Sequence, residues 1–351
     1  MLNSNASNAI VAKVRAKFSK HLTAKNYQDL LACNTVNDVA VYLKNHEGYQ
    51  RALRDMKEGI IHRGRLESLL ERDLMEDFSI LSQFGLSVGA HLGDYMRTRG
   101  EIQQLLSFLR YLIAEHPEEY IFAMSDFFRK HTPIDLVQLS KVRSYNELLV
   151  FLNDTEYYGI FEKFSFDSNI KDLDFAGLES ALYAHLYKKL FDSINKELHG
   201  TEKKEMSNIF KMKIELENIK KIYRMKKYYH MNSDRIRSML LPYYLYLTPA
   251  KLNDLLEIED YEKIHPLLKE TRYKYYLGKI CPYQTIDEMN KRVSYLFAKK
   301  NMRFSTHASV VLTCYITLKE VELQNIIIII EGKRYGLPTP EISKMLIGAD
   351  I

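Results

Sequence analysis

The sequence predicts an all-helical fold, and three of its features indicate this class. First, its 351 residues include only 14 glycines and 8 prolines, too few for the many tight turns of a sandwich, barrel or propeller. Second, apolar residues recur at helical spacing behind capping signals. Third, a helical unit occurs three times along the chain, which constrains the architecture before any motif is weighed.

A pair of short helices is expected near the start of each copy. Residues 22–31 align with residues 247–256 without a gap, and five of the ten positions are identical. A third copy begins at Thr132-Pro133 and keeps the same spacing. Three sets of residues coincide in this alignment: Thr23, Thr132 and Thr248; Leu30, Leu139 and Leu255; and Leu43, Leu152 and Leu268.

Capping signals predict where these short helices begin. Thr132-Pro133 and Thr248-Pro249 each put an N-capping hydroxyl before a proline, which suits the first helical position because its missing N–H costs nothing there. Thr35-x-x-Asp38 and Ser144-x-x-Glu147 have capping-box spacing, so a second short helix is expected about a dozen residues after the first. Each copy then reaches a tyrosine-bearing stretch, at Tyr49, Tyr157 and Tyr273.

Long amphipathic helices follow the short ones in each copy. Similar motifs near their ends place a glutamate at the same position each time, at Glu101, Glu215 and Glu322. The last long helix is expected to end at Gly336, which has proline just beyond it. The long helices are predicted over residues 66–113, 178–230 and 286–335, with breaks near 85–93, 199–200 and 301–305.

The chain therefore divides into three repeat units of about 110 residues. A length of 351 residues agrees with a division, since single cores stop growing near roughly 250 to 300 residues. The three predicted domains are 1–115, 116–230 and 231–351.

Motifs of catalysis, nucleotide binding and metal binding are missing from the sequence. The Gly332-Lys333 pair has no preceding GxxxxG frame and follows a helix, so it is not a phosphate-binding loop. The 11 histidines are scattered, with no HExxH motif. Acidic pairs such as Glu71 and Asp73 have the pattern of ordinary helix-face charges. We therefore expect a protein that is not an enzyme, with no catalytic residue, cofactor or metal.

The cysteines and the hydrophobic runs indicate a reducing compartment. Three widely spaced cysteines, Cys33, Cys281 and Cys314, favour neither a disulfide framework nor a zinc site. No signal peptide is visible at the N-terminus, and the longest purely apolar run is residues 326–330, far short of the about 20 residues that a spanning helix needs. A cytoplasmic location is expected.

One stretch of the chain is strongly basic. Residues 203–227 hold nine Lys or Arg against three Glu, and Tyr228, Tyr229 and His230 follow. A solvated helix face, a docking face for an acidic protein and an RNA-binding helix all fit this composition. The whole chain also holds 25 tyrosines and 16 phenylalanines, more than a core of this size requires, so interfaces with other proteins are expected.

The repeated motifs resemble those of the C subunit family of bacterial and archaeal V-type ATP synthases, which is equivalent to the d subunit of eukaryotic V-ATPases. The resemblance runs from about Ala12 to Leu346. Its most specific parts are FKMKIELENIKKI at 210–222 and KEVELQNI at 319–326. One departure is Gln104, which stands where the other copies have Asn218 and Asn325.

This resemblance implies a fold and a function. In that family, three similar helical domains surround a pseudo-threefold axis as a funnel. The funnel accepts the end of a central shaft made of the D and F subunits, and its base sits on the membrane ring of proteolipid subunits. The resemblance thus implies a non-catalytic coupling subunit, present in one copy per complex and attached peripherally to the membrane on its cytoplasmic side.

Two sets of residues are candidates for contact with such partners. The repeated carboxylates should occupy equivalent positions on three inner helices, although pairing with a nearby Lys or Arg inside the chain would account for them equally well. The basic stretch could add electrostatic steering toward an acidic partner. The candidate residues for partner contact are Glu101, Glu215, Glu322, Lys220, Lys221, Lys226 and Lys227.

The main alternative to a coupling subunit is a helical RNA-binding protein that uses residues 203–227. A helical enzyme without a recognisable motif is a further alternative.

Overall fold

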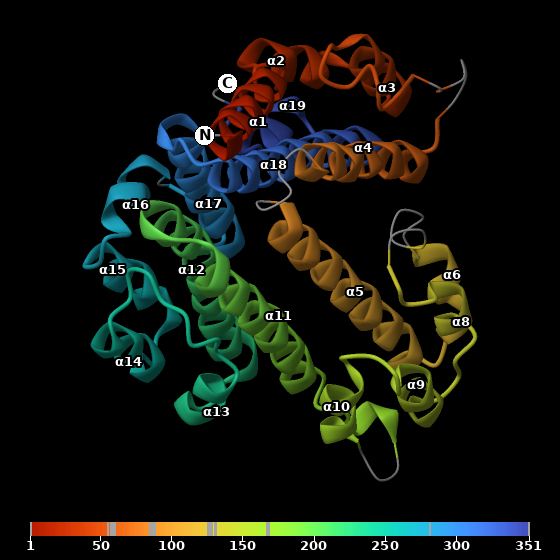
Figure 1. Cartoon of the computed structure of the whole chain (residues 1–351), viewed down its shortest axis with the longest axis vertical. Coiled ribbons are helices and arrows are strands. Elements are labelled where there is room, and N and C mark those ends of the chain that lie inside the picture. Colours follow the sequence, from red (N-terminus) through yellow and green to blue (C-terminus); the bar gives the residue numbers. More distant parts are fainter. Residues whose placement is uncertain are drawn as a thin grey trace. The chain divides into compact units, whose positions relative to one another are not determined.

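Helices form nearly all of the regular structure (Figure 1). In the computed structural model they make up 75% of the described residues, and no strand occurs among these. The all-helical prediction is confirmed, whereas the funnel arrangement stays a prediction. The structure describes residues 2–54, 56, 61–83, 89–124, 129, 132–165, 169–280 and 282–349.

The helices group into two compact units. The first contains residues 1–90, 199–233 and 243–351, and the second contains residues 91–198 and 234–242. The three predicted domains 1–115, 116–230 and 231–351 are divisions of the sequence, and as structural domains they stay a prediction.

The central helix of the first unit is α18 (Ala308–Arg334). It packs against α17 (Ile286–Phe304), α1 (Leu2–Phe18) and α4 (Arg63–Gln83), and Figure 1 shows α4 alongside it. Burial on several sides explains its β-branched run, because Ile326, Ile329 and Ile330 are all inaccessible to solvent. The remaining helices of this unit are α2 (Ala24–Ala32), α3 (Val36–Asn45), α12 (Gly200–Tyr229), α14 (Pro249–Glu257), α15 (Ile264–Lys269), α16 (Lys274–Ile280) and α19 (Thr339–Met345).

The second unit is built on two long helices, α5 (Gly89–Ile113), except for its first two residues, and α11 (Phe175–Glu197). Its core includes Phe108, Leu148 and Leu182, none of which is accessible to solvent. The short helices of this unit are α6 (Tyr120–Ala123), α8 (Leu136–Leu139), α9 (Tyr145–Leu152) and α10 (Tyr158–Phe161), and α13 (Ser233–Ser238) belongs to it except for its first residue.

The predicted long helices and two of their breaks are confirmed. Helices α11 and α12 are separated at residues 198–199, and α17 and α18 at residues 305–307. The break expected near 85–93 falls partly on residues 84–88, which lie outside the described residues. Gly336 has a φ of +66°, and the Leu337 N–H donates to the Gly332 carbonyl at 2.9 Å, as the predicted glycine C-cap requires.

The prediction that Thr132 caps a helix is wrong. Thr23 and Thr248 do cap α2 and α14, but α8 begins only at Leu136 and is capped by Asp135. The Asp135 carboxylate accepts from two N–H groups of the first turn at 3.0 Å each. The Thr132 hydroxyl is engaged elsewhere, because it donates to Glu101 at 3.0 Å.

Candidate functional site

The three repeated carboxylates all lie inside the protein. Their exposed fractions are 3% for Glu101, 0% for Glu215 and 6% for Glu322. A buried carboxylate is costly unless hydrogen bonds or a cation compensate for lost hydration, so the partners of each one determine what it does.

Glu322 on α18 joins two distant parts of the sequence. Its Oε2 accepts from the Leu22 N–H at 2.7 Å, and its Oε1 accepts from the Tyr49 hydroxyl at 2.5 Å. Lys319, one turn earlier, forms an ion pair with Oε1 at 2.6 Å and stands 3.8 Å from the centroid of the Tyr49 ring. Burial alone would raise the pKa of Glu322, but Lys319 and these hydrogen bonds hold it below its usual value.

Glu215 on α12 is held by backbone amides. Three successive N–H groups, of Leu245, Tyr246 and Leu247, donate to its carboxylate at 2.7, 3.0 and 3.0 Å. The Tyr273 hydroxyl donates to it at 2.6 Å. Burial, together with the adjacent carboxylate, raises the pKa of Tyr273 well above its usual value, so this phenol stays protonated as a donor.

Glu101 on α5 is held by two hydroxyl groups. Tyr157 donates to its Oε2 at 2.5 Å and Thr132 donates to its Oε1 at 3.0 Å. Burial and Glu101 together raise the pKa of Tyr157. The nearby Thr98 hydroxyl is completely buried and has no hydrogen-bond partner among the described residues.

One rule covers all three carboxylates: the glutamate of each copy accepts a hydrogen bond from the tyrosine of the next copy. Glu101 of the first copy pairs with the second, Glu215 of the second pairs with the third, and Glu322 of the third returns to Tyr49 of the first. The sequence alignment of the copies identified both sets of residues but did not pair them. Their separations of 56 and 58 residues for the first two pairs are the signal that could have done so.

The carboxylates therefore brace the protein internally. The structure gives each one donors within the chain, and Lys319 adds a cation at Glu322. Contact of these side chains with another subunit stays a prediction.

A second cluster of buried acidic residues lies on α4, and here the prediction of an ordinary helix-face charge is wrong for Asp73. Glu71 is exposed, as a helix-face charge should be, but Asp73 is buried next to Asp77. Burial raises the pKa of Asp73, even though Arg51 pairs with it at 2.5 Å. The Asp77 carboxylate also binds Arg51 at 2.5 Å, Lys17 at 2.6 Å and the Tyr315 hydroxyl at 2.6 Å.

The four candidate lysines lie on the C-terminal half of α12. Lys220 pairs with Glu217 on its own helix and lies 4.0 Å from Asp287 of α17. Lys221 is half-buried. Burial lowers the pKa of Lys226, against the opposing effect of Glu257 and Glu259.

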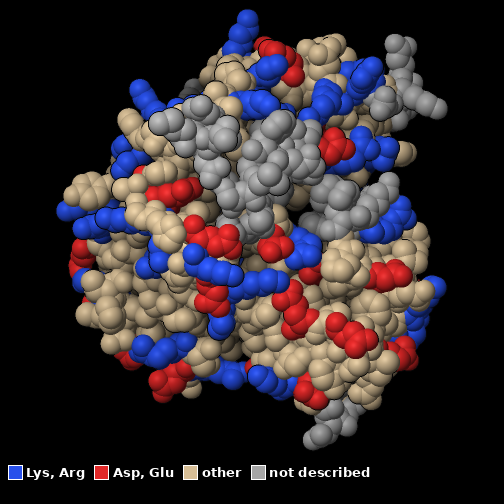
Figure 2. All heavy atoms as spheres, in the orientation of Figure 1, with Lys and Arg blue, Asp and Glu red and all other residues tan. Residues whose placement is uncertain are grey.

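Lys227 lies among tyrosines at the end of the same helix. Its ammonium donates to the Tyr223 hydroxyl at 3.0 Å and lies between 5.2 and 5.4 Å from the ring centroids of Tyr223, Tyr228 and Tyr261. Tyr228 and Tyr229 are largely exposed. On the face shown in Figure 2, Lys and Arg are interspersed with Asp and Glu rather than gathered in a field of one sign. This part of α12 thus offers a mixed aromatic and basic surface.

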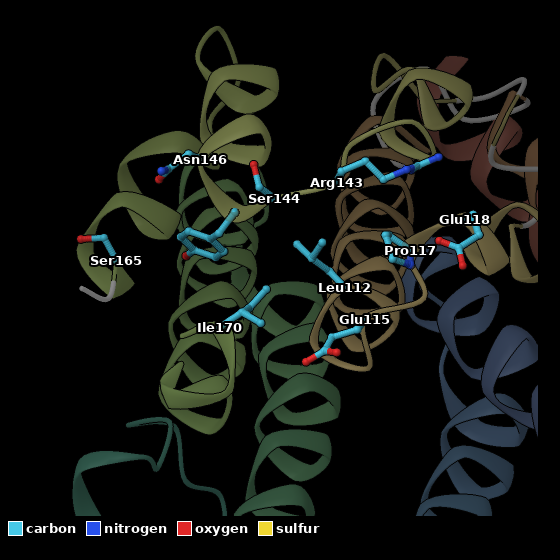
Figure 3. A pocket seen from close by; sticks show the side chains of 10 residues that line it. Leu112, Glu115, Pro117, Glu118, Arg143, Ser144, Asn146, Ser165 and Ile170 are labelled. Atoms are coloured by element: carbon cyan, nitrogen blue, oxygen red, sulfur yellow. The ribbon is translucent and has the colours of Figure 1, made fainter. Parts of the chain in front are cut away.

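A hollow of about 490 Å³ lies in the second unit, and several of the polar groups that line it bind other groups of the chain (Figure 3). Leu112, Pro117 and Ile170 supply apolar lining. The Arg143 guanidinium donates to two backbone carbonyls, and the Ser144 hydroxyl caps α9. These contacts give the hollow a structural explanation.

Within the described part of the chain, no cluster of three or more His, Cys, Asp or Glu side chains could hold a metal ion. No helix of that part is long and apolar enough to span a bilayer. Cys33 and Cys314 are free thiols, and Cys281 lies outside the described residues.

Known proteins resemble this chain over nearly its whole length. Residues 10–345 match the family model described as ATP synthase (C/AC39) subunit. The C subunit of the A-type ATP synthase of Methanosphaera stadtmanae is 24% identical over 344 residues, which cover 96% of this chain and 86% of the relative. The corresponding C subunit of the A-type ATP synthase of Methanosarcina acetivorans is 24% identical over 343 residues, covering 96% and 91%.

Proposed function

Since the chain belongs to the ATP synthase (C/AC39) subunit family, we propose that it is a non-catalytic subunit of a rotary ATPase that joins the central shaft to the proteolipid ring of the membrane. In this role it transmits the torque that couples ATP hydrolysis or synthesis to ion movement. Its partners are the D and F subunits of the shaft on one side and the ring on the other, and one copy serves each complex.

The observation that carries this proposal is the extent of the family match. It spans residues 10–345 and so includes all three repeated carboxylates together with their tyrosines. A protein that transmits torque must resist shear, and buried carboxylates bound to distant segments provide such internal bracing. The family match gives no support to the RNA-binding alternative.

Contact with the partners should be spread over a broad surface. A single ion pair at a surface contributes only about 0 to 1 kcal/mol, which is too little to hold a rotating partner. Exposed aromatic residues at helix ends, such as Tyr228 and Tyr335, offer anchors, and the lysines at the end of α12 offer steering toward acidic groups. The attachment to the membrane is peripheral and runs through the ring.

The decisive experiment is reconstitution of the rotary complex of the same organism with and without this chain. Complexes in liposomes are supplied with ATP, and ATP hydrolysis and ion transport are measured together, with probes for both H⁺ and Na⁺. We expect hydrolysis to continue without the chain while transport is lost, and both to proceed when it is added back.

Two outcomes would contradict the proposal. Ion transport that continues at full rate in a complex shown by mass spectrometry to lack the chain would exclude a coupling role. Failure of the purified chain to bind either the D–F shaft or the detergent-solubilised ring would exclude the proposed position in the complex.

A further inference from the structure

The N-terminal segment, defined as residues 10–54, is fastened to the rest of the first unit by a series of polar contacts. At its start, Arg15 donates to the carbonyl of Ser305 at 2.8 Å, where α17 has just ended. Lys17 pairs with Asp77 of α4 at 2.6 Å. Charged side chains therefore fix the first helix to two different helices.

The middle and the end of the segment are fastened in the same way. The Tyr27 hydroxyl accepts from Asn325 of α18 at 3.1 Å, and the Leu31 carbonyl accepts from Lys333. Arg51 pairs with Asp73 and Asp77 of α4. Together with the bonds from Leu22 and Tyr49 to Glu322, these contacts form what we call the seam.

Glu322 is the centre of the seam and differs from the other two repeated carboxylates. Three residues before it stands Lys319, where the other copies have Thr98 and Met212. Lys319 binds the carboxylate and lies against the Tyr49 ring, so one cation holds both partners. The hydrogen bonds of Glu101 and Glu215 link residues at most 58 positions apart. Glu322 instead binds Tyr49 and Leu22, which lie 273 and 300 positions away in the sequence.

The segment also buries apolar side chains such as Val14, Leu30 and Leu43, so the polar seam is the place where a local opening would begin. When surfaces held by charged and polar groups separate, water restores hydration to those groups, which it cannot do for apolar groups. Proteins open locally in cooperative segments at free energies below that of global unfolding. The bonds of Glu322 close longer loops than those of Glu101 and Glu215. Their entropic cost is therefore larger, although this cost grows slowly with loop length.

We propose that the N-terminal segment is a strap that opens and closes on α18 as one unit, with Glu322 as the positioning residue that holds it shut. We further propose that a shut strap is needed for the protein to transmit torque between shaft and ring. This second part rests on the function proposed above.

The test uses two variants with the same chemical change. Tyr49→Phe removes the hydroxyl that binds Glu322, and Tyr273→Phe removes the corresponding hydroxyl that binds Glu215. Amide hydrogen exchange is followed on the full chain. Because a hydrogen bond to a charged group is lost, Tyr49→Phe should speed exchange about tenfold or more over residues 22–31 and 46–54. Residues 243–249 should keep their wild-type rates.

The control must show the reverse pattern. Tyr273→Phe should speed exchange near residues 243–249 and leave the strap as in the wild type. Equal acceleration of both regions by Tyr49→Phe, or no acceleration of the strap, would overturn the proposal. Lys319→Met, which copies Met212 of the second copy, gives a second test and should also open the strap.

The part of the proposal that concerns torque is tested in the reconstituted complex. We expect Tyr49→Phe to lower the number of ions transported per ATP hydrolysed by about twofold or more, with Tyr273→Phe much closer to the wild type. Equal ratios for the two variants would overturn this part. If the wild-type chain itself fails to restore transport, the proposed function is refuted, and the exchange experiment on the isolated chain still decides whether the strap exists.

Discussion

Tyr49 donates a hydrogen bond to Glu322 across 273 residues of sequence, and both side chains are buried. The same bond occurs between Tyr157 and Glu101 and between Tyr273 and Glu215. The repeat is thus visible in the contacts as well as in the sequence. The contacts of Glu215 and Glu322 each lead to a measurable expectation.

Replacing Glu215 with Gln should destabilise the protein by about 2–4 kcal/mol, because an amide group cannot accept from all four donors that surround this carboxylate. Chemical denaturation of the full chain measures the change. The matched control is Glu217→Gln, two positions along the same helix, where the side chain is 51% exposed and pairs with Lys220. That change should cost at most about 1 kcal/mol. Equal losses of unfolding free energy in the two variants would show that the four donors around Glu215 do not make it more important for stability than an exposed glutamate.

Stability should fall in acid partly through Glu322. Its folded pKa lies below its usual value of 4.5, so its contribution is present above pH 4.5 and is lost as the pH falls through the lower folded value. Asp77 acts in the same direction, whereas Asp73, with a raised pKa, opposes it. Denaturation curves between pH 3 and 7 should therefore show a weaker pH dependence for Glu322→Gln. A variant curve parallel to that of the wild type would contradict this.

Gly332 should tolerate no side chain. A Cβ placed there would lie 2.5 Å from two side-chain carbons of Ile342, which is fully buried on α19. Gly332→Ala should cost about 1–3 kcal/mol by overpacking, measured by thermal or chemical denaturation. Adding Ile342→Val should recover part of the loss. Gly278→Ala, where the space around the Cβ is open, serves as control and should be neutral or slightly stabilising.

The lysines at the end of α12 should influence the rate of partner binding. Replacing Lys220, Lys221, Lys226 and Lys227 with Gln should slow association with the D–F shaft or the solubilised ring at low salt and flatten its salt dependence, with unchanged helix content. Stopped-flow or surface-binding kinetics measure both quantities. The matched control replaces Lys203, Lys204, Lys211 and Lys213 on the same helix. If both quadruple variants slow association equally, net charge rather than this location is responsible.

Much of the fold could be predicted from the sequence because its signals are local. Capping hydroxyls, helical spacing of apolar residues and the glycine at 336 act within one or two turns, and the long helices lie where they predict. Thr132 shows the limit of such signals. Its local pattern fits an N-cap, but a tertiary bond to Glu101 engages its hydroxyl and Asp135 caps the helix instead.

The candidate site could be predicted only in part, because burial is not a local property. The alignment singled out Glu101, Glu215 and Glu322, yet their hydrogen-bond partners in other segments lie 30 to 300 residues away. Asp73 has the sequence pattern of a surface charge because it directly follows two other charged residues, Glu71 and Arg72. The burial of Asp73 comes from tertiary packing, in which α4 packs against α18 and Arg51 of a distant segment pairs with the carboxylate.

The order of the carboxylate bonds also bears on how such a chain could have arisen. A single copy holds one glutamate and one tyrosine of this kind, and in the present chain each glutamate binds the tyrosine of a different copy. An ancestor of one copy's length would therefore have needed its sister molecules to satisfy these groups, and a closed trimer of identical chains does so for every protomer. Gene fusion would then have turned intermolecular bonds into intramolecular ones, with the bond between Tyr49 and Glu322 as the one that no short linker spans.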